Sequence, residues 1–171
     1  MKIMKSLKSI VAILALVGAS HFVSAQKVAH INLQQLIENH PDMLSANKQL
    51  ETIAGTYDKD YTMMVTEFTN KRDKYIAEES TTSEAVNQER AIELQNMQKS
   101  IQDFYTDAQK KLSEKELELK KPIAEKVTEA IQKVAKAKGY EYVLDATSGS
   151  GVLYAAGVDI MDDVKKELGI K

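Results

Sequence analysis

The stretch "ESTTSE", residues 79–84, decides how the chain folds, because it interrupts a long tract rich in Glu, Lys, Gln, Ala and Leu. It is the only polar, hydroxyl-rich break between residues 41 and 138, a region that holds a single glycine, Gly55. Alanine and straight-chain residues favour helix, so the tract is expected to be helical on both sides of the break. Thr81 and Glu84 have the spacing of a capping box and predict the start of a second helix.

Apolar residues recur every three or four positions on both sides of the break, as one face of a helix requires. The first stripe is Leu50, Ala54, Tyr57, Tyr61, Val65, Phe68 and Tyr75 or Ile76, and the second is Val86, Leu94, Met97, Ile101, Tyr105, Ala108, Leu112 and Leu119. The stripes are mirror images about residue 81, since Leu50 corresponds to Leu112 and Tyr61 to Ile101. This symmetry predicts an antiparallel helical hairpin over residues 42–121 with its tip near Thr81.

The hairpin has the proportions of an arm. Each leg, residues 42–80 and 83–121, has 39 residues and would extend about 58 Å at a rise of about 1.5 Å per residue. The stripe repeats closer to every 11 residues than to every 7, which predicts legs that are nearly straight or have a slight right-handed supercoil. Near the tip the facing residues become polar, with Arg72 opposite Arg90 and Tyr75 opposite Asn87, so we expect the outer part to be looser.

Residues 26–41 and 122–171 are expected to form a small head at the base of the arm. Residues 27–32 have the composition of a short strand, and Asn32 can cap a helix that runs through His40. Pro41 is suited to open the first long helix. Pro122 removes one helical hydrogen bond, so a kink or restart is expected where the second leg enters the head.

The C-terminal part of the head alternates between strand-like and helical segments. An amphipathic helix through Ile123, Val127, Ala130, Ile131 and Val134 is expected to end at Gly139. The segments 140–146 and 152–156, joined by Ser148-Gly149-Ser150-Gly151, are predicted to pair as a β-hairpin. Asp159 is expected to cap a final helix through Leu168. About 65 residues make only a marginal core with open strand edges, so the head is predicted to oligomerise.

Residues 1–25 have the features of a secretory signal peptide. Lys2, Lys5 and Lys8 precede an apolar run, and the small residues before Gln26 predict cleavage there. The mature chain then has 20 basic and 25 acidic residues, a net charge near −5. This acidity argues against a nucleic-acid partner, and the absence of cysteine excludes disulfides.

The mature sequence resembles the Skp/OmpH family of periplasmic chaperones along its whole length. The resemblance is carried by "KVAHINLQQLIENHPD", the charged hairpin, "AKAKGYEYVLDAT" and "GVLYAAGVDIMDDVKKELGI". It implies an α+β, mostly α fold: a homotrimer with a β-barrel body built from all three subunits and three arms around a cavity. It also implies an ATP-independent holdase that keeps unfolded outer-membrane β-barrel precursors from aggregating in the periplasm.

One feature differs from the better-known members of the family, which are basic and have positively charged arms. The tip of this arm, "AEESTTSEAVNQER", carries more acidic than basic residues. Contact with lipopolysaccharide or anionic lipid, which has been suggested for the family, is therefore not expected. Capture of an unfolded client would depend more on apolar contacts.

Most of the stripe residues are expected to form the core of the arm. Candidate client-binding residues are apolar side chains that leave the stripe at about 100° per residue. Met63 and Ile92 point away from the predicted seam, and Ile53, Met64 and Phe104 lie on its flanks. Methionine suits unspecific contact because its unbranched thioether adapts its shape.

The sequence predicts no catalytic residues, no metal site and no cofactor. The mature chain has no cysteine, and its two histidines, His30 and His40, are expected to be structural or surface residues. "SGSG" at residues 148–151 is not followed by Lys-Ser or Lys-Thr and therefore lacks the features of a phosphate loop. Two alternatives to a holdase stay open: a coiled structural spacer that binds a folded partner in the envelope, and a surface adhesin, for which no anchor motif is present.

Overall fold

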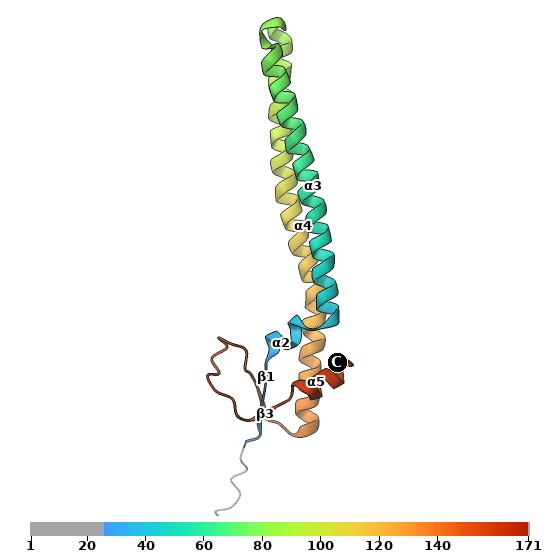
Figure 1. Cartoon of the computed structure of the whole chain (residues 1–171), viewed down its shortest axis with the longest axis vertical. Helices are drawn as coiled ribbons and strands as arrows, with labels where there is room; N and C mark the ends of the chain where they lie inside the picture. Colours follow the sequence, from blue (N-terminus) through green and yellow to red (C-terminus); the bar gives the residue numbers. More distant parts are fainter. Residues whose placement is uncertain (1–25, 171) are drawn as a thin grey trace, which may run out of the picture.

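The computed structural model describes residues 26–170, so the signal peptide predicted for residues 1–25 lies outside the described residues. The elements in chain order are β1 (Val28–Ile31), α2 (Leu33–Glu38), α3 (Pro41–Glu78), the 3₁₀ turn η2 (Glu79–Thr81), α4 (Glu84–Lys138), β2 (Tyr142–Asp145), β3 (Val158–Asp159) and α5 (Met161–Leu168). Figure 1 shows two long helices that rise from a small base containing the strands. The mostly helical chain with a small strand-containing part agrees with the predicted fold class.

Helices α3 and α4 run antiparallel, side by side, and are joined through η2 at the top of Figure 1. Their aromatic contacts are Tyr57 with Phe104 and Tyr61 with Tyr105, with ring centroids 6.2 and 5.8 Å apart. The midpoints of both pairs along the sequence lie between residues 80 and 83. Apolar side chains at helical spacing on both helices therefore meet along a single seam.

The turn at the tip differs from the predicted capping box. Ser83 is the N-cap of α4, and its hydroxyl accepts a hydrogen bond from the N–H of Val86 at 3.4 Å. The Thr81 hydroxyl instead donates to the carbonyl of Glu78 at 3.0 Å. The prediction for Thr81 is wrong because η2 continues the winding of α3 through this residue, and the extended backbone that an N-cap needs is first reached after it.

A restart of the helix at Pro122, one of the two predicted outcomes, is also wrong, since α4 continues without interruption from Glu84 to Lys138. The proline ring is exposed, and beyond it α4 buries Ile123, Val127 and one face of the following turns against the head. Burying several apolar side chains offsets the loss of one helical hydrogen bond. The helix ends at Gly139, as predicted, in the left-handed conformation (φ 70°) that glycine adopts without strain.

The strands form a three-stranded sheet in the order β2-β1-β3, and both pairs are parallel. The predicted hairpin between residues 140–146 and 152–156 is therefore wrong: β2 pairs with β1, and residues 152–156 form no strand. Parallel neighbours need a crossover connection. Residues 146–157 provide it, carrying the chain from one edge of β1 to the other.

One face of the sheet packs against α2, α5 and the last turns of α4. The core there consists of Ala29, Ile31, Leu36, Val127, Ala130, Val134, Ile160 and Val164. A second, smaller cluster of Met43, Ala46 and Ile123 lies where α3 and α4 leave the head. His40 is buried beside it and caps α3, because its Nδ1 accepts a hydrogen bond from the N–H of Asp42 at 3.1 Å.

Three side chains satisfy the first N–H groups of α2. The N–H of Leu33 donates to Asp145 (3.2 Å), that of Gln34 to the Thr147 hydroxyl (3.1 Å) and that of Gln35 to Asn32 (2.9 Å). Asp145 also accepts from the N–H of Thr147 at 2.9 Å. The Asp-Ala-Thr part of "YVLDAT" thus connects the end of β2 to the start of a helix more than 110 residues earlier in the chain.

At the other end of the head, Asp159 contributes to the start of α5 as predicted. Its carboxylate accepts a hydrogen bond from the N–H of Met161 at 2.8 Å, although Ile160 holds the N-cap position itself. The helix ends at Leu168, followed by Gly169 with φ 69°. Val164 and Ile160 are fully buried, so the start of this short helix is part of the core of the head.

Replacing Asp145 by alanine is expected to lower the free energy of unfolding by about 1–2 kcal/mol, because two N–H donors lose their acceptor. The Thr147 side chain first, and then the N–H groups of Thr147 and Leu33, hold the pKa of Asp145 below its ordinary 3.8. Its contribution is therefore present above that value and lost as the pH falls through the lowered folded-state pKa. Urea titrations at several pH values measure this.

The matched control is Glu141→Ala, at an exposed carboxylate beside β2 that makes no side-chain hydrogen bond in the described part of the chain. This variant should change stability by less than about 0.5 kcal/mol. An equal loss in both variants, or an Asp145→Ala effect that persists unchanged at about pH 2, would contradict the assignment.

Candidate client-binding surface of the arm

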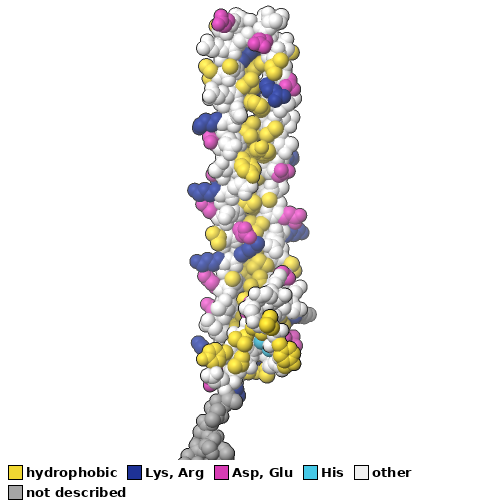
Figure 2. All heavy atoms as spheres, turned by 90° about the vertical axis from the view of Figure 1, so that its left-hand side faces the viewer, with side chains coloured by type: hydrophobic (Ala, Val, Ile, Leu, Met, Phe, Trp, Pro, Cys, Tyr) yellow, Lys and Arg dark blue, Asp and Glu magenta, His cyan; other side chains and the backbone are white. Residues whose placement is uncertain are grey.

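The arm is only two helices thick, so few of its side chains leave the solvent. Between residues 47 and 122, Ala108 is the one buried side chain, and the other seam residues are half-buried or exposed. Figure 2 shows a hydrophobic stripe along the middle of the arm with charged side chains on both flanks. The seam is therefore both the structural contact between the helices and an apolar surface that another chain can reach.

The five predicted client-binding residues do not come together in one site. Met63 and Ile92 are 54% and 53% exposed, whereas Ile53, Met64 and Phe104 are half-buried. Ile53 and Met63 are ten residues apart on α3, about 15 Å along the helix. The candidates therefore lie along the arm as separate apolar positions.

Two of the five line grooves. Met63 contributes to an open depression of about 370 Å³ on α3, together with Thr62, Thr66, Glu67, Asn70 and Lys71. Phe104 belongs to a smaller groove between α3 and α4. This second groove, called the aromatic groove below, has a volume of about 220 Å³ and is lined by Ala54, Tyr57, Asp58, Tyr61, Phe104, Tyr105, Ala108, Gln109 and Leu112.

Four aromatic rings form the walls of the aromatic groove. Tyr57 meets Phe104 edge to face at an interplanar angle of 81°, and Tyr61 meets Tyr105 at 57°. Tyr105 is 49% exposed despite its place in the predicted stripe. The groove exists because the small side chains of Ala54 and Ala108 leave space between the helices that these rings border but do not fill.

Sequence reasoning missed the three tyrosines of the groove because it assigned them to the core of the arm. A signal was available: Tyr57 and Tyr61 are four residues apart, and the adjacent pair Phe104 and Tyr105 lies at the mirror position. Side chains four residues apart share one helix face. Four aromatic side chains that face one another beside alanines indicate a seam of uneven width. The rings are too large to be covered by two helices, and the alanines are too small to fill the space between them.

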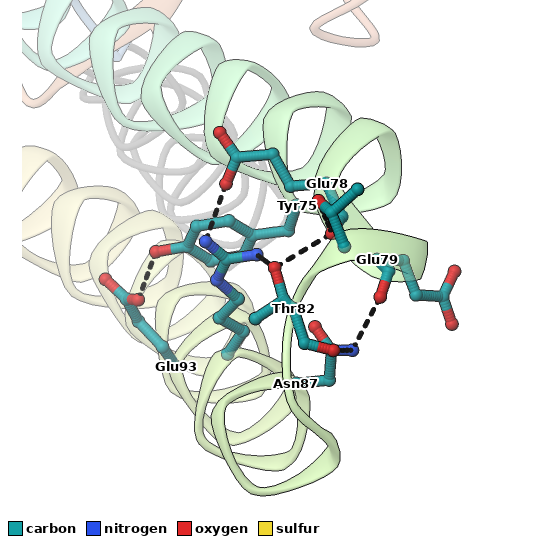
Figure 3. Close-up of polar contacts among 8 residues, drawn as sticks. Tyr75, Glu78, Glu79, Thr82, Asn87 and Glu93 are labelled. Carbon is teal, nitrogen blue, oxygen red and sulfur yellow. Dashed lines mark hydrogen bonds and ion pairs between the residues drawn. The ribbon is translucent and has the colours of Figure 1, made fainter.

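A polar network replaces the apolar seam near the tip, as Figure 3 shows. The Tyr75 hydroxyl donates to Glu93 at 2.5 Å, and Lys71 forms an ion pair with the same carboxylate. Arg90 lies over the Tyr75 ring, 4.5 Å from its centroid, and pairs with Glu78 at 2.6 Å. The cation–π contact and the ion pairs cross from one helix to the other and hold the tips together.

The network corrects two of the facing pairs expected from the mirror symmetry. Arg72 does not face Arg90 but pairs with its neighbour Asp73 at 2.8 Å. Asn87 does not face Tyr75 but donates to the carbonyls of Glu79 (3.0 Å) and Thr82 (3.4 Å). Both differences avoid the burial of like charges or unpaired polar groups at the end of the seam.

Glu93 is the electrostatic centre of this network. The hydrogen bonds from Lys71 and then Tyr75 hold the pKa of Glu93 below its ordinary value. The same contact with Glu93 raises the pKa of Lys71 and that of Tyr75. All three groups are open to solvent, so their contribution is one of local order at the tip and is reduced by salt.

Residues 26–170 contain neither a metal cluster nor a membrane-spanning helix. No three His, Asp or Glu side chains among residues 26–170 are grouped as metal ligands would be. None of the helices in that part of the chain has both the length and the apolar character needed to cross a membrane. Accessible apolar surface on the arm is therefore the feature that a functional assignment has to explain.

Comparison with known proteins agrees with this architecture. The family model described as outer membrane protein (OmpH-like) matches residues 27–168. The chain belongs to the OmpH-like family. No curated protein matches the sequence.

A solved structure has the same fold as this OmpH-like chain. It is the crystal structure of a candidate OmpH-like outer membrane chaperone from Caulobacter crescentus CB15, with a TM-score of 0.73. The two sequences are 19% identical over 88% of each chain. At this identity the similarity concerns the fold, and the residues of the aromatic groove are considered for this chain alone.

Replacing Glu93 by glutamine is expected to loosen the tip of this OmpH-like arm, because the ion pair with Lys71 is lost. The lowered pKa of Glu93 means that its contribution is present above its ordinary value of 4.5. That contribution is lost as the pH falls through the lowered folded-state pKa. Hydrogen exchange should show amide protection near residues 70–95 that falls at low pH in the parent and is weaker and flatter in the variant.

The control is Glu89→Gln, an exposed carboxylate on α4 one turn nearer the tip. Its protection profile should follow that of the parent at all pH values. Equal protection in the Glu93→Gln variant and the parent at neutral pH would show that the network contributes nothing to the order of the tip.

Proposed function

We propose that this OmpH-like chain is an ATP-independent periplasmic holdase that binds unfolded outer-membrane β-barrel precursors and prevents their aggregation. The observation that carries this proposal is the half-exposed apolar seam that follows the arm from its base to the polar network near the tip. The name of the family and the description of the Caulobacter relative as a candidate outer membrane chaperone support the client class. The predicted signal peptide supports the location.

The mechanism consists of many weak contacts along the arm. The groove volumes of about 220 and 370 Å³ lie on the open surface of the helices, and neither encloses a ligand. Shallow apolar positions favour an unfolded chain that exchanges rapidly between them over a single compact ligand. Release then requires no nucleotide, because each contact is individually easy to break.

The head supports assembly into an oligomer, which we propose to be a trimer on the basis of the family resemblance. In the parallel register Val28 lies beside Tyr142 and His30 beside Leu144, so these residues share the face of the sheet opposite the core. Val28, Tyr142 and Leu144 are all exposed. In the crossover the Leu153 side chain is 100% exposed. Such an apolar face on a sheet with open edges is expected to be covered by further subunits.

A coiled structural spacer is the second candidate function. It would use the same long arm but bind one folded partner. The two functions differ in range, because a holdase should bind several unrelated unfolded barrels and a spacer should bind none. Exposed apolar side chains that the hairpin contact does not require, such as Met63 and Ile92, favour the holdase, since a spacer gains nothing from them.

Native mass spectrometry of the mature chain, residues 26–171, tests the proposed function. With an unfolded outer-membrane β-barrel and no nucleotide, we expect a trimer that gains one client per three subunits. A trimer that binds no unfolded barrel would favour the spacer. A monomer would contradict the role assigned to the head.

The variant Leu144→Asp tests whether the exposed face of the head sheet is the contact between subunits. The side chain is exposed in the single chain, so the fold measured by circular dichroism should be retained. A buried aspartate between subunits costs several kcal/mol, so the variant should be monomeric. A trimeric Leu144→Asp variant would exclude this face of the sheet as the subunit contact.

The combined variant Met63→Ser, Met64→Ser, Ile92→Ser and Phe104→Ser tests the arm residues. We expect client affinity to fall by about a hundredfold or more, because each of the four lost contacts contributes about half of the 1.5–3 kcal/mol of full burial. The oligomer measured by native mass spectrometry should be unchanged. Four serine substitutions at the exposed polar positions Gln88, Gln95, Gln98 and Gln102 of α4 provide the control. Equal client affinities of the two variants would show that these four apolar side chains are not the client-binding residues.

A further inference from the structure

The aromatic groove combines two features that point to a positively charged occupant: rings from four aromatic side chains, and the carboxylate of Asp58 at its edge. We propose that the groove binds arginine side chains of the unfolded client, with the guanidinium against the tyrosine rings and near Asp58. The proposal rests on the holdase function and names the client chemistry that one part of the arm selects. A cation over an aromatic face is attracted by the negative face of the ring.

The same arm already contains this arrangement with its cation in place. At the tip Arg90 lies over the Tyr75 ring, with Cζ 4.5 Å from the centroid, and pairs with Glu78 at 2.6 Å. The groove offers the same kinds of group, tyrosine rings and a carboxylate, but its rings come from both helices and no arginine lines it. The contact between Arg90 and Tyr75 therefore shows the chemistry that the groove can offer to an arginine from outside.

The charges around the groove leave Asp58 available. Asp103 and Asp107 lie nearby on α4 and are neutralised by ion pairs, with Lys99 at 3.1 Å and Lys111 at 2.7 Å. Among the ion pairs of residues 26–170, none includes Asp58. Lys111 lies close enough to Tyr57 to interact with it electrostatically, but Asp107 is its main partner. An external cation can therefore pair with Asp58 without displacing an internal one.

The net charge of the arm also favours a positively charged occupant. Residues 42–121 contain 16 acidic and 12 basic side chains, so the arm carries most of the negative charge of the mature chain. A negative arm attracts cationic segments from a distance and repels acidic ones. Apolar seam contacts hold any unfolded chain, whereas the groove adds a preference for arginine-containing segments.

Arginine fits the groove better than lysine for a geometric reason. The guanidinium is planar and weakly hydrated, so it stacks on an aromatic ring while its N–H groups point to a carboxylate. Tyr105 is half-exposed at the mouth of the groove and Tyr61 packs against it, so a planar group can approach from solvent. A compact, strongly hydrated ammonium loses more hydration at the same position.

Fluorescence anisotropy with a pair of unstructured peptides tests the proposal on the mature chain. Both peptides carry the same apolar and polar residues and an uncharged fluorophore. One contains three arginines, and the other contains citrulline, the neutral analogue of the same shape, at those positions. At about 0.15 M salt we expect the arginine peptide to bind about tenfold more tightly.

Asp58→Asn and Asp60→Asn separate the groove from the net charge, because both remove one negative charge from α3 but only Asp58 lines the groove. Asp58→Asn should reduce the preference for arginine to about threefold, and Asp60→Asn should leave it near tenfold. Tyr61→Leu with Tyr105→Leu should reduce it as Asp58→Asn does. Asp58→Asn preserves the size of the side chain and the helix around it. Its effect on the preference for arginine can therefore be interpreted even where the tyrosine variant has a lower melting temperature.

An unfolded barrel titrated in parallel distinguishes failure of this inference from failure of the holdase function. Equal binding of the two peptides, or equal loss in Asp58→Asn and Asp60→Asn, overturns the groove as an arginine site while the barrel still binds. Binding of the barrel without binding of either peptide overturns it as well. If the barrel also fails to bind, both the inference and the proposed function are wrong.

Discussion

The thickness of the arm is the constraint on which the rest of the structure depends. A helix in a two-helix hairpin can cover only one side of its partner, so even the side chains that face each other keep an edge in water. Between residues 47 and 122, Ala108, with its single methyl group, is the only buried side chain, whereas the rings around it remain half-exposed. Hydrophobic burial per residue is therefore low, and it becomes complete only at the base, where Ile37 of α2 joins Met43 and Ile123.

Other interactions supplement the weak seam. Pairs of Lys and Asp or Glu four residues apart follow the outer face of α4, such as Lys99 with Asp103 and Lys120 with Glu116. Each contributes only a few tenths of a kcal/mol to helix stability, but together they favour helix in the part of the chain where packing contributes least. At the tip, Glu93 and Arg90 join the two helices by contacts that need no buried apolar surface.

Features that follow from local chemistry could be predicted from the sequence. Asn32 caps α2, Pro41 opens α3 and Gly139 ends α4, because each depends on the conformation or hydrogen bonding of one or two residues. Features set by distant contacts could not. The apolar segments around residues 148–151 have the local pattern of a hairpin, but β1 lies between β2 and β3 and pairs with both. Pro122 lies within a helix because residues beyond it are buried in the head.

The candidate site could likewise be predicted only in part from the sequence. Periodicity separates the seam from the outer face and so identifies Met63 and Ile92 as exposed, but it cannot show that Tyr57, Tyr61 and Tyr105 border an unfilled groove.

The number of contacts that a client needs links the arm to the head. A half-exposed side chain gains on contact only about half of the 1.5–3 kcal/mol that full burial provides. Micromolar affinity corresponds to about 8 kcal/mol before the cost of immobilising the client. Some six or more such contacts are therefore needed, and the exposed apolar side chains of one arm are spread from Leu44 at its base to Ile76 near its tip. Under the proposed function, several arms around one client would supply these contacts more readily than one arm. The exposed face of the head sheet is then as much a part of the proposed binding mechanism as the arm itself.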